Sequence, residues 1–146
     1  MSRPYIPVAV RTLVTNRATG RCEYCLCPVA YSSDPFAMEH ICPFALGGVS
    51  DESNLALACD GCNSRKQIAT RALDPLTLEI VSLFHPRRDR WAEHFAWGTD
   101  ELSLVGLTAT GRATIERLEL NRTGVINVRR LLRLVGEHPP EHTPGR

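Results

Sequence analysis

The sequence has no long hydrophobic run and almost no excess of charge of either sign. No apolar stretch approaches the roughly 20 residues that a helix needs to cross a bilayer. The first residues lack the basic-then-apolar pattern of a secretory signal. With 17 basic against 16 acidic residues, the net charge of +1 argues against a strongly basic domain unless charge is concentrated locally. These absences predict a soluble, cytoplasmic protein with no membrane partner.

Lysine is nearly absent, because Lys66 is the only one in 146 residues and the other basic residues are arginines. A guanidinium group can bind phosphate oxygens through two parallel N–H groups, so arginine suits a phosphate-rich partner. A GC-rich coding bias would produce the same composition, and both interpretations stay open. The hydrophobic fraction of 43% is enough to build the core of one ordinary domain.

Hydrophobic periodicity and turn-forming residues divide the chain into four segments. They are an N-terminal helix (1–20, helical over 7–16), a central module (21–74), an accessory region (75–136) and a proline-containing disordered tail (137–146). The central module is expected to contain a cysteine-rich knuckle (21–28), strands over 36–43 and 54–58, and a helix over 60–72. The accessory region is expected to contain a strand over 76–84, a hairpin of 94–97 with 102–107, and helices over 111–120 and 125–135.

Four of the six cysteines form two CxxC pairs, Cys22 with Cys25 and Cys59 with Cys62. Two such knuckles together supply four thiolates, the ligand set of a closed tetrahedral zinc site. The intervening residues 26–58 are too many for a simple zinc ribbon, so a structure of its own must fill the gap. We therefore expect a structural Zn²⁺ that stabilises the fold and takes no part in chemistry.

Other interpretations of the cysteines are weaker. A redox CxxC would be expected beside a βαβ pattern, which the sequence does not show. Cys27 could compete with Cys25 as a ligand, but the matched CxxC spacing favours Cys25. Cys27 and Cys42 are expected to be small buried or surface thiols.

The residues between and after the knuckles form an ordered set of short motifs. In chain order they read Glu39-His40-Ile41-Cys42-Pro43, Gly47-Gly48, Asn54-Leu55, Cys59-Asp60-Gly61-Cys62-Asn63 and Arg65-Lys66. This order resembles the HNH endonuclease family, in particular those members whose ββα-metal hairpin and helix are stapled by four cysteines. The resemblance extends from Arg21 to about Ile68. It implies an α+β fold, a ββα-metal (His-Me finger) module with a four-cysteine zinc staple, here joined to a small mixed α/β C-terminal extension.

The resemblance also implies a role for each matched position. His40 corresponds to the general base, and Asn54 to the middle asparagine that braces the hairpin and orients that histidine. Glu39 and Asn63 fall where the family binds a catalytic divalent ion, Mg²⁺ or Mn²⁺. Glutamate replaces the more usual aspartate at position 39, which adds one methylene to the ligand arm. Arg65 and Lys66 are expected to contact phosphates.

The chemistry of these residue types agrees with such roles. A neutral imidazole can take a proton from water near pH 7, and carboxylate and amide oxygens suit a hard divalent cation. Adjacent strand residues point to opposite faces, so Glu39 and His40 need a local bend to serve one site. Structural alternatives stay open: Asn54 could form a turn, Asn63 could cap a helix, and Arg65 and Lys66 could lie on a solvated helix face.

The accessory region holds six arginines but only two glutamates between residues 111 and 133. Such a patch could follow a nucleic-acid backbone or could be an ordinary solvated helix face. Trp91, Phe95 and Trp97 are expected to build a small core, and His85 and His94 to be structural. The sequence thus predicts a metal-dependent endonuclease acting on nucleic acid, and we expect that nucleic acid to be DNA. The alternative is a zinc-stapled nucleic-acid-binding module without catalytic activity.

Overall fold

The computed structural model describes residues 4–143 and places three two-stranded antiparallel sheets among five α-helices in this part of the chain. The elements are α1 (Val8–Arg17), β1 (Ala37–His40), β2 (Leu55–Ala58), α2 (Asp60–Lys66), β3 (Arg71–Leu73), β4 (Ile80–Ser82), α3 (Trp91–His94), β5 (Phe95–Trp97), β6 (Leu104–Gly106), α4 (Ala109–Leu118) and α5 (Thr123–Leu134), with short 3-10 turns at Val29–Tyr31 and Phe44–Leu46. No helix among residues 4–143 is long and apolar enough to span a bilayer.

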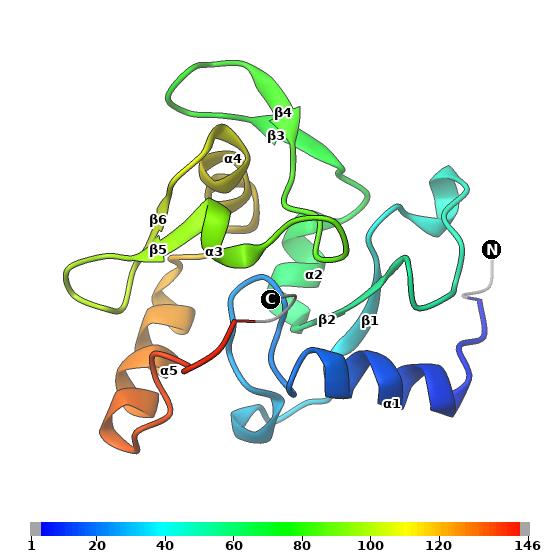
Figure 1. Ribbon diagram of the computed structural model, residues 1–146, viewed down its shortest axis with the longest axis horizontal. Coiled ribbons are helices and arrows are strands. Elements are labelled where there is room, and N and C mark those ends of the chain that lie inside the picture. Colours follow the sequence, from blue (N-terminus) through cyan, green and yellow to red (C-terminus); the bar gives the residue numbers. More distant parts are fainter. Residues whose placement is uncertain (1–3, 144–146) are drawn as a thin grey trace.

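Strands β1 and β2 and helix α2 form the expected ββα finger. The strands pair with His40 opposite Leu55, and α2 begins two residues after β2 ends (Figure 1). The connection between the strands is shaped by Asn54, whose side chain accepts from the Cys42 N–H at 2.8 Å and donates to the carbonyls of Cys42 and Val49 at 2.9 Å. These bonds hold the connection in one conformation, which sets where β1 ends.

Strand β2 is buried along its whole length because it is covered on both faces. Leu55 and Leu57 pack with Val14 of α1, while Ala56 and Ala58 face the larger core around the cysteine knuckle. The alternation follows from the two-residue period of a strand. In Figure 1, α1 runs beneath the β1–β2 pair and α2 lies between that pair and the C-terminal region. The confirmed fold class is thus a small mixed α+β structure.

The accessory region packs on the finger through an aromatic core. Phe84, Trp91 and Phe95 are each no more than 3% exposed, and the ring centroids of Trp91 and Phe95 lie 5.1 Å apart. Strands β5 and β6 pair as the expected hairpin, and α4 and α5 follow as the two expected helices. The aromatic residues therefore lie in the core, as the sequence analysis expected.

Two elements differ from the sequence analysis. The helix expected over 60–72 ends at Lys66, because Gln67 adopts φ +53°, and the chain turns into β3 (Arg71–Leu73). The strand expected over 76–84 is shorter. Its first part forms the β3–β4 turn, held by the buried Asp74 carboxylate, which accepts from the Thr77 hydroxyl at 2.8 Å. Because the buried carboxylate stabilises a polar turn here, the apolar periodicity predicted a strand that is longer than the one observed.

The expected disordered tail also differs in the part that the structure describes. His138 is only 7% exposed, its Nε2 lies 2.6 Å from the Glu101 carbonyl oxygen, and its ring packs edge-on against Trp97. Arg21 donates to the Glu137 carbonyl at 2.9 Å. Glu137 and His138 therefore contact Arg21 and the accessory region, whereas residues 144–146 of the expected tail lie outside the described part of the chain.

Candidate active site and zinc centre

The two CxxC pairs meet in space. The sulfur atoms of Cys22, Cys25, Cys59 and Cys62 all lie within 4.8 Å of one another, and the Cys25 and Cys59 sulfurs are 3.8 Å apart. Sulfurs about 2.3 Å from one zinc ion stand ~3.8 Å apart in a tetrahedron. The four thiols therefore fit a Zn²⁺ ion. Cys25 belongs to this cluster and Cys27 does not.

Local hydrogen bonds define the conformation of both cysteine knuckles. In the first, the Cys22 N–H donates to the Cys27 carbonyl and the Leu26 N–H to the Cys22 carbonyl, each at 2.9 Å, with Leu26 at φ +65°. In the second, Cys59 caps α2, and its sulfur accepts from the Cys62 N–H at 3.4 Å. Each knuckle thus turns two thiols toward one point.

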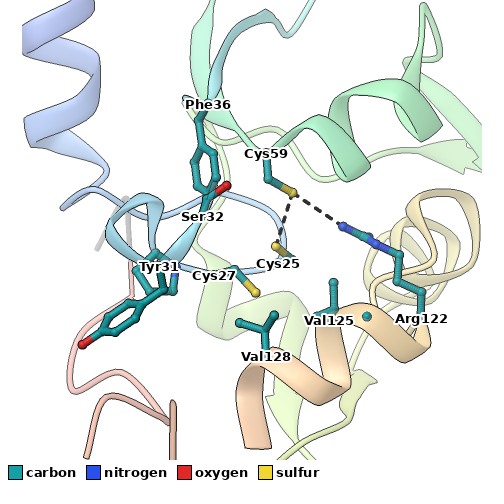
Figure 2. Close-up of a pocket in the computed structure, with 11 residues that line it drawn as sticks. Cys25, Cys27, Tyr31, Ser32, Phe36, Cys59, Arg122, Val125 and Val128 are labelled. Atoms are coloured by element: carbon teal, nitrogen blue, oxygen red, sulfur yellow. Dashed lines mark hydrogen bonds between the residues drawn. The ribbon is translucent and has the colours of Figure 1, made fainter. Parts of the chain in front are cut away.

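Arg122 is a partner of this cluster that the sequence analysis missed. Its guanidinium lies 3.5 Å from the Cys59 sulfur and 3.6 Å from that of Cys62, and Figure 2 shows it reaching from the start of α5 toward Cys59. A cation beside four thiolates offsets the net negative charge that they keep around one Zn²⁺. Gly61 lies against the same guanidinium, where a β-carbon would collide with it. Only proximity in the fold identifies Arg122, because no local motif marks it.

A separate cavity of about 600 Å³ lies on the other side of the ββα finger. Its walls include Glu39, His40 and Asn63, three of the four expected catalytic residues, together with Asp60 at the start of α2. Glu39 and His40 are neighbours in sequence, yet both border this cavity, because the cavity runs along the whole of β1 (Ala37–His40). Asn54 does not line it and instead braces the connection described above.

One ring nitrogen of His40 is held and the other is free. Nε2 lies 2.9 Å from the Ser50 hydroxyl oxygen, whereas Nδ1 has no hydrogen-bond partner within residues 4–143. Partial burial lowers the pKa of His40 below its ordinary 6.5, so the neutral imidazole persists to lower pH. Ser50 is a second contact that the sequence analysis did not identify.

Glu39 is 3% exposed and lies between two partners. Its Oε2 accepts from the Tyr24 hydroxyl at 2.8 Å, and its Oε1 lies 2.6 Å from Lys66 Nζ without the geometry of a hydrogen bond. Burial raises the pKa of Glu39, although the Lys66 ammonium and Tyr24 oppose this effect. One carboxylate oxygen is therefore left without a hydrogen bond inside the protein.

Lys66 does not lie at the surface, which corrects its expected role as a phosphate contact. It is 1% exposed, and Nζ donates to the Ile41 carbonyl at 3.0 Å in addition to pairing with Glu39. A buried ammonium requires such partners because its desolvation is costly. Since it touches both Glu39 and the residue after His40, Lys66 instead ties α2 to the end of β1.

Most of the arginines that the sequence analysis considered for nucleic-acid contact are bonded to other residues of the chain. Arg65 pairs with Glu119 at 2.9 Å and donates to the Gly61 carbonyl. Other side-chain contacts in the accessory region are Arg112 with Asp74 at 2.8 Å, Arg117 with the Lys66 carbonyl, Arg129 with the carbonyls of Leu102 and Cys25, Arg130 with Asn127 and Arg133 with the Asp100 carbonyl. Arg129 is buried under the knuckle. These arginines thus mainly hold the accessory region together and fix it to the finger.

Comparison with known proteins agrees with the geometry of the finger. Residues 22–67 match the family model described as HNH endonuclease. No curated protein matches the chain, and no solved structure matches it. The match begins at the first zinc-site cysteine, ends just after α2, and includes His40, Asn54 and Asn63. Over residues 22–67 the chain therefore carries a domain of the HNH endonuclease family, as its motifs indicated.

Proposed function

We propose that this protein is a metal-dependent endonuclease that hydrolyses phosphodiester bonds of DNA, with His40 as general base. The observation that carries the proposal is the state of His40. One ring nitrogen is oriented by Ser50, and the other is free in a cavity shared with Glu39 and Asn63. A general base needs an oriented, neutral and accessible nitrogen. The HNH domain supports nucleic acid as the partner.

Glu39 and Asn63 would hold the catalytic Mg²⁺ or Mn²⁺ ion. A carboxylate and an amide oxygen are suitable ligands for a hard cation. Glu39 and Asn63 line the same cavity as His40, and a cation there would compete with the Lys66 ammonium, 2.6 Å from Glu39 Oε1. Such an ion would neutralise charge on the phosphoryl group and the leaving oxygen. The zinc at the four cysteines is separate and structural.

The chain itself supplies the base and its orientation. When Nε2 donates its proton to the Ser50 hydroxyl, Nδ1 is unprotonated and can take a proton from the attacking water. Asn54 keeps the connection after His40 in place, so the imidazole stays aimed into the cavity. Tyr24 and Lys66 fix the position of the buried Glu39 carboxylate, and Glu39 is one of the residues that line the same cavity.

As the pH is lowered, the cleavage rate should fall only below pH 6.5. The base acts in its neutral form, and burial lowers the pKa of His40 from 6.5, so lowering the pH inactivates the enzyme when it passes this lowered pKa. The measurement is the pH profile of kcat/KM in a plasmid-nicking assay. An acid limb centred above pH 6.5 would contradict His40 as the titrating base.

The function itself is tested by plasmid nicking with Mg²⁺ or Mn²⁺, with and without a mild chelator. We expect chelation to stop nicking before it unfolds the protein, because a hard-cation site with few protein ligands releases its ion more readily than four thiolates release zinc. Far-UV circular dichroism and zinc content on the same sample are the controls. Returning Mg²⁺ should restore nicking, and activity that survives removal of every exchangeable ion would refute the ion's role.

The second candidate function is a nucleic-acid-binding module without cleavage activity. It is favoured by the Lys66 ammonium at 2.6 Å from Glu39 Oε1, since a cation already lies beside the carboxylate expected to bind the metal. The nicking assay separates the two candidates.

A nucleic-acid partner and reduced thiols both suit the cytoplasm, and this location stays a prediction.

A further inference from the structure

A second cavity, of about 490 Å³, lies between the ββα finger and the accessory region. Its walls come from the end of β1, the end of α2, hairpin β3–β4 and the turn after β4, and include Cys42, Lys66, Arg71, His85, Arg88 and Asp89. Glu39 lines the His40 cavity and Lys66 lines this one. The buried Glu39–Lys66 ion pair therefore connects the two cavities, with Glu39 at the first and Lys66 at the second.

Three side chains at this second cavity have N–H groups that donate no hydrogen bond within residues 4–143. The Arg88 guanidinium has no partner within residues 4–143, and Arg71 uses one nitrogen to donate to the Ile80 carbonyl at 3.2 Å. His85 Nδ1 accepts the Arg87 N–H at 3.2 Å, which places the imidazole proton on Nε2. Nε2 has no partner in the described chain, so the histidine is a neutral donor.

The cavity is also electropositive. Because Glu39 neutralises Lys66, the remaining positive charges are those of Arg71 and Arg88. They stand against one carboxylate among the lining residues, Asp89, which accepts from the His85 backbone N–H at 2.9 Å. Burial lowers the pKa of His85, the charge of Arg88 lowers it further, and Asp89 opposes this shift. Unpaired guanidinium groups around a hollow provide the geometry and charge that recognise phosphate oxygens.

We propose that this second cavity binds a phosphate of the DNA strand adjacent to the scissile phosphodiester, through Arg71, Arg88 and the Nε2 proton of His85. The proposal rests on the proposed function, which places the scissile phosphate at His40. Cys42 at the second cavity is two residues from His40, a span of at most ~7 Å of extended chain. The two cavities are therefore close enough for one DNA strand to reach both. The second cavity thus lies where a phosphate next to the scissile one would bind.

The test is the salt dependence of binding of a short duplex DNA, measured on a His40→Ala background so that the DNA stays intact. Each phosphate contact contributes close to one unit to the slope of log K against log salt, so Arg71→Gln/Arg88→Gln should reduce that slope by about 2. The matched control is Arg90→Gln/Arg130→Gln, which removes the same charge from two exposed arginines outside both cavities. Its slope should stay near the parent value.

Cys42 offers a second measurement, because its thiol is exposed at the cavity and lies outside the zinc cluster. Duplex DNA should protect Cys42 from alkylation, as measured by peptide mass, and the Arg71→Gln/Arg88→Gln pair should lose that protection at equal DNA concentration. Equal slopes for the two double variants, or alkylation of Cys42 unaffected by DNA, would overturn the proposal.

The experiments distinguish failure of the second-cavity proposal from failure of the proposed endonuclease activity. Wild-type nicking with no effect of Arg71→Gln/Arg88→Gln on binding would refute the second cavity alone. Binding that depends on Arg71 and Arg88 in a protein that nicks no DNA would refute the endonuclease and leave the phosphate site supported. Thermal unfolding of both double variants should match the parent, since all four arginines are solvent-exposed.

Discussion

Replacing His40 by alanine is expected to lower the nicking rate by a factor of roughly 10²–10⁴, the usual contribution of a positioned general base. Folding and DNA binding should change little. His40 is only partly buried, its side chain has one hydrogen-bonding contact within residues 4–143, with Ser50, and it belongs to neither core cluster. Nicking rate, DNA affinity and thermal unfolding should be measured on one sample of the variant.

Asn54→Ala provides the comparison for this experiment. Asn54 makes three hydrogen bonds to the backbone of the β1–β2 connection and is 7% exposed, so its loss should reduce both activity and stability. An unsatisfied buried backbone group costs about 1–3 kcal/mol. If His40→Ala nicks at the wild-type rate, the base lies elsewhere. If it loses zinc or the folded state, His40 is structural and the non-catalytic module becomes the leading interpretation.

Replacing Cys59 by serine is expected to release the zinc ion and unfold the finger. Cys59 supplies one of four clustered thiols, caps α2 and lies beside Arg122. In small structural sites the metal-binding free energy, roughly 10–16 kcal/mol, is largely folding free energy. Because both knuckles also carry buried core residues, the loss should extend to the whole domain. Zinc content and circular dichroism measure the effect.

Cys42→Ser is the matched control, since Cys42 is exposed and outside the cluster. It should keep one zinc ion per chain and unfold at the parent temperature. X-ray absorption should show four sulfur ligands in the parent and in this control. Nitrogen or oxygen ligation in the parent, or a stable fold in Cys59→Ser, would contradict the staple.

Much of the finger could be predicted from short-range patterns. The CxxC spacing indicated which cysteines cluster, and the order of His40, Asn54 and Asn63 indicated the hairpin and helix that carry them. Such motifs are readable because their residues are fixed relative to one another by the local backbone. Boundaries were harder to predict. Helix α2 ends at Lys66 because Gln67 adopts a positive φ of 53°, which no periodicity reveals.

The charged residues show where sequence reasoning fails. Lys66 follows Arg65 on a helix and resembles a phosphate contact, yet it is buried between Glu39 and the Ile41 carbonyl. A cation on a helix face is exposed or buried according to what packs on that face. Here β1 and the accessory region cover it, and a buried carboxylate makes the burial tolerable.

By itself the sequence determined which four cysteines cluster, the family of the central domain and the order of its elements. These depend on residue spacing and on chemistry that is local to each motif. Only the tertiary structure decided that Arg122, 60 residues from Cys62, lies at the cysteine cluster, that Glu39 and His40 share a cavity, and that Arg71 and Arg88 face a second one. The physical reason is that the partner of a charge is chosen by packing between distant segments, which no local pattern encodes.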